Sequence, residues 1–176
     1  MADASTQSND QIIPEKQTSL GLYVTSEQAY RKYQAASDTV KILDVRTPEE
    51  YVFVGHAEMA VNIPLAFVTY HWNDEEDHFD PRINQEFIAR VTEWAEPDDV
   101  LLVMCRSGGR SAMAVNALAK AGFTNAYNIV DGMEGDKVRD PESLYVGKRM
   151  KNGWKNSGLP WTYDFDPEQI RVSADG

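Results

Sequence analysis

Residues 100–111 of the 176-residue chain read VLLVMCRSGGRS, and they join an apolar run directly to a loop of small and basic residues. A run without polar side chains, such as 100–104, is typical of a strand that is buried on both faces of a parallel sheet. The loop at 105–111 follows at once, and the helix-forming residues 112–120 come next. The stretch therefore predicts a strand, a tight turn and a helix.

The rest of the chain alternates the same two kinds of element. Short apolar runs that predict further strands occupy 21–24, 41–45, 60–63 and 126–130. Helices are expected at 26–35 and from Pro48 onward, because a Thr stands at each N-cap position with Gln or Glu three residues later. Strands that alternate with helices predict an α/β fold with a five-stranded, mainly parallel sheet and helices on both faces.

The aromatic and acidic residues at 65–80 predict a loop or an irregular insertion rather than a regular element. Asp80-Pro81 is typical of a helix start, because Asp is a favourable N-cap and Pro a favourable first helical residue. Apolar side chains then recur at helical spacing, as at Phe87 and Val91. A helix is therefore expected to begin near Pro81.

The length predicts one domain, which we place at 20–162. A polar tail at 1–19 precedes it, and a second tail at 163–176 follows it. Two insertions are expected inside the domain, near 65–80 and at 137–152. Long insertions near a site are often functional, so we hypothesise that one or both cover the binding pocket and narrow the choice of the molecule that reacts there. The alternative is surface decoration without a catalytic role.

Charge and composition argue against several partners and leave the compartment open. The formal net charge is −11, whereas nucleic-acid binding needs a basic surface. The apolar stretches are too short and interrupted for a membrane span, so no membrane partner is expected. Residues 1–20 lack the basic start and apolar block of a secretory signal. We expect a cytoplasmic protein, or a periplasmic one if the chain is the mature form of an exported protein.

Cys105 is the only cysteine, so no internal disulfide can form, and its chemistry must be completed by an external molecule. It follows the predicted strand 100–104, at the sheet edge where ligands bind. Gly108 and Gly109 let the backbone curl so that successive N–H groups point at one centre, and the following helix adds its positive end. These features predict an anion cradle for a thiolate nucleophile. A buried structural cysteine would need no such loop.

The loop at 105–110 resembles the six-residue active-site loop of the rhodaneses, the thiosulfate sulfurtransferases. LDVRTPEEY at 43–51, GHA at 55–57 and NIP at 62–64 resemble the N-terminal signature of that family. DGM at 131–133, GW at 153–154 and GLP at 158–160 are similar to its C-terminal signature. The resemblance covers about residues 20–160 and rests on separated motifs in the family's order.

The resemblance implies a two-step sulfur transfer without a cofactor. Cys105, the catalytic residue, would attack the outer sulfur of thiosulfate, release sulfite and pass the persulfide sulfur to cyanide or a thiol. The substrate-binding residues would be Arg106, Ser107, Gly108, Gly109, Arg110 and Ser111. Arg106 and Arg110 would attract the sulfonate of an anionic donor, because guanidinium groups pair well with oxyanions. Ser111 is expected in the first turn of the following helix, where its hydroxyl would cap the helix, the favoured role, or face the loop.

Other polar residues are assigned supporting roles. Asp44 and Arg46 are expected to form an internal ion pair at the pocket. His56 belongs to a scaffold motif of the family, which favours a structural role. His71 and His78 flank an acidic cluster, but their spacing fits no standard metal template, so no metal site is expected.

Three other functions are possible for a loop of this kind. Phosphatases of this fold have one more residue between the cysteine and the arginine, so the shorter loop at 105–110 disfavours a phosphatase. A non-catalytic binding module is disfavoured because the cysteine and its loop are complete. A dedicated sulfur carrier, which takes a persulfide from one partner protein and delivers it to another, fits the same residues.

Overall fold

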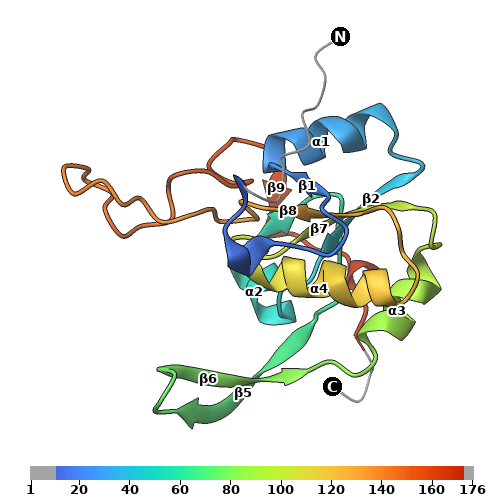
Figure 1. Cartoon of the computed structure of the whole chain (residues 1–176), viewed down its shortest axis with the longest axis horizontal. Coiled ribbons are helices and arrows are strands. Elements are labelled where there is room, and N and C mark those ends of the chain that lie inside the picture. The colour runs from blue at the N-terminus through green and yellow to red at the C-terminus, as the bar shows by residue number, and fades with distance from the viewer. Residues whose placement is uncertain (1–10, 173–176) are drawn as a thin grey trace.

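A five-stranded parallel sheet forms the centre of the computed structural model, which describes residues 11–172 (Figure 1). The strand order is β1-β8-β7-β2-β4, and every neighbouring pair is parallel. The strands are β1 (Tyr23–Val24), β2 (Val40–Asp44), β4 (Ala60–Asn62), β7 (Val100–Met104) and β8 (Ala126–Ile129). The predicted α/β fold is confirmed, and Cys105 follows the central strand.

Helices cover both faces of the sheet, as predicted (Figure 1). One face packs against α3 (Phe87–Trp94) and α4 (Gly109–Lys120). The other packs against α1 (Ser26–Ala35) and α2 (Pro48–Phe53). Successive side chains of β7 enter the two cores in turn, because strand residues point alternately to opposite faces. The central strand is therefore buried on both sides.

The two helices with predicted capping boxes begin where the sequence places them. The Thr25 hydroxyl accepts a hydrogen bond from the Gln28 N–H, and the Gln28 side chain accepts one from the Thr25 N–H, so α1 starts at Ser26. Thr47 and Glu50 form the same reciprocal pair at the start of α2. Each pair satisfies backbone N–H groups that lack a partner within the helix.

The prediction for the segment after residue 65 is wrong. An antiparallel hairpin of β5 (Ala66–Asn73) and β6 (His78–Ile83) replaces the expected loop, and no helix begins at Asp80-Pro81. Pro81 lies within β6, which is possible because a two-stranded hairpin leaves outward-facing N–H positions unpaired. The hairpin projects from the body of the molecule (Figure 1).

Both predicted tails contain ordered segments. Residues 1–10 and 173–176 lie outside the described residues. Residues 11–19 include the 3₁₀ helix η2 (Pro14–Lys16), and Ile12 packs in a small buried cluster with the first strand. At the other end, the N–H of Arg171 donates to the Asn62 carbonyl at 2.8 Å, so the chain continues along the edge of β4.

The segment at 137–152 returns to the body through a buried anchor. Trp154 is fully buried, and its indole N–H donates to the Pro160 carbonyl at 2.8 Å. A short antiparallel pair of β3 (His56–Ala57) and β9 (Trp161–Thr162) then holds the chain against the domain. Among the described residues, no helix has the length and apolar character needed to cross a membrane.

Asp44 and Arg46 form the internal ion pair that the sequence predicts. Both side chains are fully buried, and the Arg46 guanidinium donates to both Asp44 carboxylate oxygens at 2.7 to 3.1 Å. The same guanidinium donates to the Gly55 carbonyl at 2.8 Å, which links the end of β2 to the end of α2. Burial by itself lowers the pKa of Arg46, but the Asp44 carboxylate outweighs it and the pKa is raised.

We expect Asp44→Asn to lower the free energy of unfolding by about 3–5 kcal/mol, because it leaves the Arg46 charge buried without a counter-charge. Urea unfolding followed by circular dichroism measures this loss. The matched control is Glu86→Gln, which breaks the exposed pair of Glu86 with Arg90 and should cost much less, because solvent screens the charges. Equal losses in the two variants would contradict a structural role for the buried pair.

Candidate active site

The loop after β7 holds the Cys105 sulfur on a backbone donor. The N–H of Gly108 donates to Cys105 Sγ at 3.2 Å, and Cys105 is only 2% exposed. Gly108 adopts φ = +100°, a conformation that L side chains rarely adopt. A Cβ at this position would also collide with the Val130 carbonyl oxygen. Only glycine can therefore turn this N–H toward the sulfur.

The helix that follows adds a second favourable element. α4 begins at Gly109, directly after the residue that donates to the sulfur. The first turn of a helix carries unpaired N–H groups and the positive end of the helix dipole. Cys105 therefore lies at the end of α4 that favours an anion.

Asn128, a fully buried residue of β8, fixes the position of this loop. Its side-chain amide donates to the Gly108 carbonyl at 3.0 Å and to the Lys16 carbonyl at 2.9 Å. Its side-chain oxygen accepts a hydrogen bond from the Ser111 hydroxyl at 2.6 Å. One buried amide thus joins β8, the Cys105 loop and the N-terminal segment.

Ser111 acts differently from the expected helix cap. Gly108 is the N-cap of α4, and no side chain caps that end. Ser111 Oγ lies 3.4 Å from Cys105 Sγ and 2.6 Å from Asn128 Oδ1. A hydroxyl has one proton, and the shorter contact assigns it to Asn128. The Ser111 hydroxyl therefore contacts both the Cys105 sulfur and the Asn128 amide oxygen, with the shorter distance to Asn128.

The two arginines of the loop have different surroundings. Arg110 donates two hydrogen bonds to the Glu50 carboxylate, at 2.6 and 2.7 Å. Burial lowers the pKa of Arg110, but the Glu50 carboxylate outweighs it and the net pKa is raised. Arg106 is exposed, and its carbonyl accepts the N–H of Glu134 at 2.9 Å. Arg110 thus ties the loop to α2, whereas the Arg106 side chain reaches solvent.

Asp131 supports the loop from the turn that follows β8. Its carboxylate accepts hydrogen bonds from the Ser26 N–H and hydroxyl and from the Gly153 N–H, at 2.8 to 3.1 Å. Burial raises the pKa of Asp131 above its ordinary value despite these donors. In the same turn, the N–H of Met133 donates to the Cys105 carbonyl at 2.8 Å. The turn therefore fixes the backbone on which the sulfur sits.

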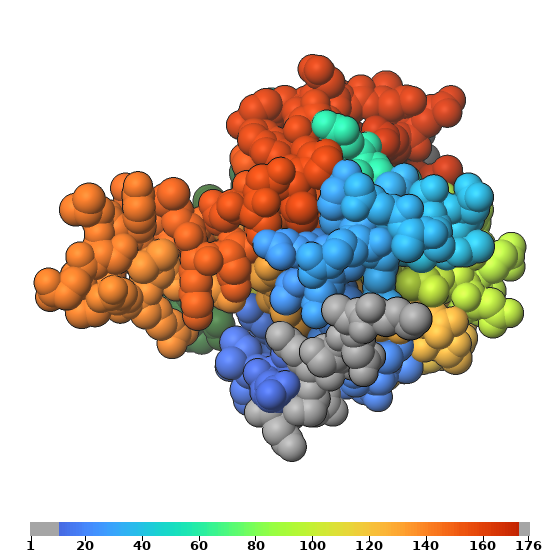
Figure 2. Space-filling model, turned by 90° about the horizontal axis from the view of Figure 1, so that it is seen from above, coloured from blue at the N-terminus to red at the C-terminus, as the bar shows by residue number. Residues whose placement is uncertain are grey.

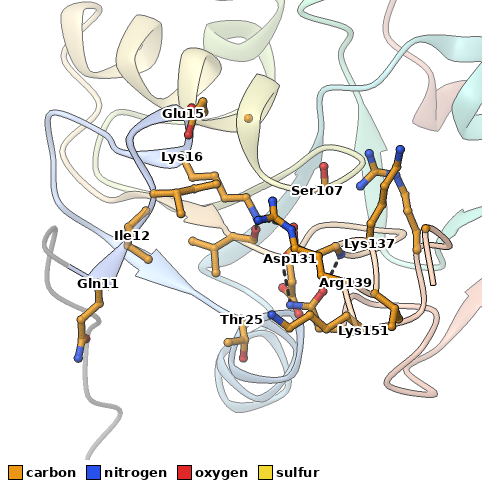
Figure 3. Close-up of a pocket in the computed structure, with 18 of the residues that line it drawn as sticks. Gln11, Ile12, Glu15, Lys16, Thr25, Ser107, Asp131, Lys137, Arg139 and Lys151 are labelled. Carbon is orange, nitrogen blue, oxygen red and sulfur yellow. Dashed lines mark hydrogen bonds and ion pairs between the residues drawn. The ribbon is translucent and has the colours of Figure 1, made fainter. Parts of the chain in front are cut away.

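A cavity of ≈ 970 Å³ opens beside the loop (Figure 3). Ser107 and Gly109 line it, but Cys105 itself is not among the lining residues. Its other walls come from the N-terminal segment, from Thr25, from residues 130–136 after β8 and from the insertion at 137–152. The basic lining residues are Lys16, Lys137, Arg139, Arg149 and Lys151. The insertion therefore borders the candidate site, whereas none of the hairpin residues lines this cavity.

The three histidines contact other parts of the structure. His56 is buried and stacks on Tyr51 with ring centroids 3.7 Å apart, and its Nδ1 lies 3.0 Å from the Tyr51 carbonyl. Burial lowers the pKa of His56, which favours the structural, neutral ring that the sequence suggests. His71 and His78 lie on the hairpin. In the described part of the chain, no cluster of three or more His, Cys, Asp or Glu residues could hold a metal.

Sequence reasoning did not identify Asn128, Glu50 or Lys16 as parts of the site. Asn128 carries a signal, because it is a polar residue within the apolar run of a predicted strand. Glu50 was assigned only to a helix cap, and its contact with Arg110 spans sixty residues of sequence. Nothing in the sequence places Lys16 beside the loop.

Comparison with known proteins identifies the family. The chain matches the model described as the rhodanese-like domain over residues 26–137. The protein therefore belongs to the rhodanese-like family. It is 32% identical to an uncharacterized protein of Rickettsia rickettsii over 129 residues, which is 73% of this chain and 87% of the relative.

Two further relatives bear on the site and the fold. The chain is 38% identical over 92 residues to the Arabidopsis thaliana protein named thiosulfate sulfurtransferase 16, chloroplastic, covering 52% of this chain and 69% of that protein. It also resembles the crystal structure of Rv0390 from M. tuberculosis, with a TM-score of 0.62 and 28% identity. That match covers 80% of this chain and 96% of the other.

We expect Gly108→Ala to destabilise the protein and to move the N–H away from the sulfur. The matched control is Gly122→Ala, because Gly122 also has φ = +100° but has open space where a Cβ would lie. The control should cost about 1 kcal/mol for backbone conformation alone. Gly108→Ala should cost more, and thermal unfolding measures the difference. Equal losses would contradict close packing of the loop against Val130.

We expect Glu50→Gln to lower the free energy of unfolding at pH 7 by about 1–2 kcal/mol, a modest loss because both partners are partly exposed to solvent. Burial raises the pKa of Glu50, but Arg110 and the Thr47 N–H outweigh it, so the net pKa lies below the ordinary 4.5. This stabilisation is present above pH 4.5 and is lost as the pH falls through the lowered pKa.

Urea unfolding of both proteins from pH 7 to pH 3 tests this expectation. The difference between wild type and Glu50→Gln should shrink below pH 4.5. Glu93→Gln, at an exposed pair with Arg90, serves as the control and should change little at any pH. A difference that stays constant through this range would contradict a charged Glu50–Arg110 pair.

Proposed function

We propose that this protein is a sulfurtransferase that carries a sulfane sulfur as a persulfide on Cys105. The observation that carries the proposal is the hydrogen bond from the Gly108 N–H to Cys105 Sγ at the start of α4. Backbone donors and a helix N-terminus stabilise an anion at a fixed place. Membership of the rhodanese-like family, and the resemblance to a protein named thiosulfate sulfurtransferase, support the same reaction.

In the first step, the Cys105 thiolate attacks the outer sulfur of thiosulfate. The bond between the two thiosulfate sulfurs breaks, its electron pair leaves with sulfite, and a disulfide-type bond forms to the outer sulfur. In the second step, cyanide or a thiolate attacks that outer sulfur and the Cys105 thiolate leaves. The persulfide between the steps is an anion, so the Gly108 N–H and α4 stabilise it as they stabilise the thiolate.

The surroundings of the two arginines suggest how an anionic donor is bound. Arg110 is held by Glu50, so its main role in the proposal is to position the loop. Arg106 is exposed and is the guanidinium that can meet the sulfonate of an incoming donor. The other residues proposed to border the substrate are Ser107, Gly109 and Ser111. Thiosulfate, or a similar small anion, is therefore the donor that we propose.

The size of the neighbouring cavity favours a second candidate, a sulfur carrier. Thiosulfate has only five heavy atoms, whereas the cavity beside Ser107 measures ≈ 970 Å³ and is bordered by the insertion at 137–152. A larger thiol, or a segment of a partner protein, would use this space. The carrier differs from the enzyme in taking its sulfur from a protein persulfide. In either case, we propose that the insertion narrows the choice of acceptor.

The test is to load the reduced protein with thiosulfate and to measure its intact mass beside a Cys105→Ser control. The wild type alone should gain one sulfur atom and lose it again when cyanide is added. Gain by the Ser variant would place the sulfur elsewhere and contradict the proposal. Loading from a protein persulfide but not from thiosulfate would favour the carrier over the enzyme.

A further inference from the structure

The hairpin presents an apolar face to solvent. Alternate residues of β6 point to the same face, so Phe79, Pro81 and Ile83 share one face with their partners across the hairpin, although the register shifts between Val68 and Trp72. The members of these pairs are Ala66 with Ile83, Val68 with Pro81, and Trp72 with Phe79. Four of these side chains are 45 to 51% exposed, namely Val68, Trp72, Phe79 and Ile83. A contiguous exposed apolar surface of this kind marks an interaction site.

The opposite face explains how the hairpin holds its shape while this surface stays exposed. The Asp80 carboxylate accepts a hydrogen bond from the Asn73 side-chain amide at 3.0 Å, and the Asp80 backbone carbonyl accepts one from the Thr69 hydroxyl at 2.6 Å. Arg82 lies over the ring of Phe67, 4.7 Å from its centroid. Polar contacts thus occupy one face only. An isolated two-stranded hairpin is marginally stable in water, so burial of its apolar face would add stability.

The hairpin is also strongly acidic. Residues 66–83 contain five carboxylates, Asp74, Glu75, Glu76, Asp77 and Asp80, against one arginine. With neutral histidines their net charge is therefore −4. The four acidic residues at 74–77 form the exposed tip between β5 and β6. A protein surface that binds here must be apolar and basic.

A second projecting segment of the same chain has these properties. Residues 137–151 extend from the body on the same side of the molecule as the hairpin (Figure 1), and Figure 2 shows this arm standing clear of the domain. The arm has five cations against Asp140 and Glu142, so its net charge is +3. Its exposed apolar side chains are Leu144, Tyr145, Val146 and Met150.

We propose that the protein forms a symmetric dimer in which the acidic hairpin at 66–83 of one copy docks on the basic arm at 137–151 of the other. The hairpin and the arm carry opposite charges, and both expose apolar side chains. The net charge of −11 makes the remaining surface repulsive between copies. The hairpin and the arm project on one side of the molecule. Two copies related by a two-fold axis can therefore make the hairpin–arm contact twice and form a closed dimer.

The dimer would bring the two copies together beside the candidate active site. Lys137, Arg139 and Lys151 belong to the arm and also line the cavity next to Ser107. A hairpin docked on the arm would therefore border the cavity of the neighbouring copy. The proposed dimer contact rests on the hairpin and the arm alone, so it does not depend on the proposed sulfur transfer.

The contact is tested by reversing the charge of the hairpin in one variant and of the arm in another. Sedimentation velocity then measures whether each variant is a monomer or a dimer. The hairpin variant is Asp74→Lys with Glu75→Lys, Glu76→Lys and Asp77→Lys. The arm variant is Arg139→Glu with Lys148→Glu and Lys151→Glu, all exposed positions. The wild type should be a dimer and each variant a monomer, because each variant meets a like charge across the interface. A one-to-one mixture of the two variants should form a heterodimer, since both contacts are then matched.

The control Glu96→Lys with Asp98→Lys changes exposed carboxylates outside both arms and should remain dimeric. Circular dichroism must show that every variant is folded. A wild type that is monomeric at the highest attainable concentration would overturn the proposal and leave the hairpin face to a different protein. The proposal would also be overturned if the hairpin variant or the arm variant alone stayed dimeric, or if the mixture of the two stayed monomeric.

Discussion

The buried amide of Asn128 joins three segments that are far apart in the sequence. Its hydrogen bonds reach the Gly108 carbonyl, the Ser111 hydroxyl and the Lys16 carbonyl. A buried amide that loses such partners carries a large desolvation cost, so the arrangement has little freedom to move. Holding the Gly108 carbonyl also fixes the next peptide units of the loop. The position of the Cys105 sulfur therefore depends on a residue that does not touch it.

Further contacts hold the same loop from other directions. Glu50 binds Arg110 from α2, and the turn after β8 donates to the Cys105 carbonyl. A donor that is fixed before the reaction stabilises a developing anion without reorganising at that moment. The insertion at 137–152 adds a cavity wall on the neighbouring side. The domain thus holds the Cys105 loop rigidly and places the basic insertion beside it, whereas the protein as a whole is acidic.

Local signals predicted local structure well. The capping boxes at Thr25 and Thr47 gave the starts of α1 and α2, because their contacts span only three residues. The apolar run of β7 gave the central strand. Asp80-Pro81 led to the wrong prediction of a helix start, because the same dipeptide also fits a strand of a hairpin. The polar Asn128 stands out within an apolar run, but its partners lie 17 or more residues away, and the contact of Glu50 with Arg110 spans 60 residues, so no local pattern could reveal these pairings.

We propose that the backbone of the Cys105 loop holds a sulfur anion. The most direct measurement is the amide spectrum of ¹⁵N-labelled protein before and after addition of thiosulfate. The Gly108 resonance should shift strongly in the wild type, return when cyanide is added and not move in Cys105→Ser. A protein that gains sulfur on Cys105 while the Gly108 resonance stays in place would contradict it.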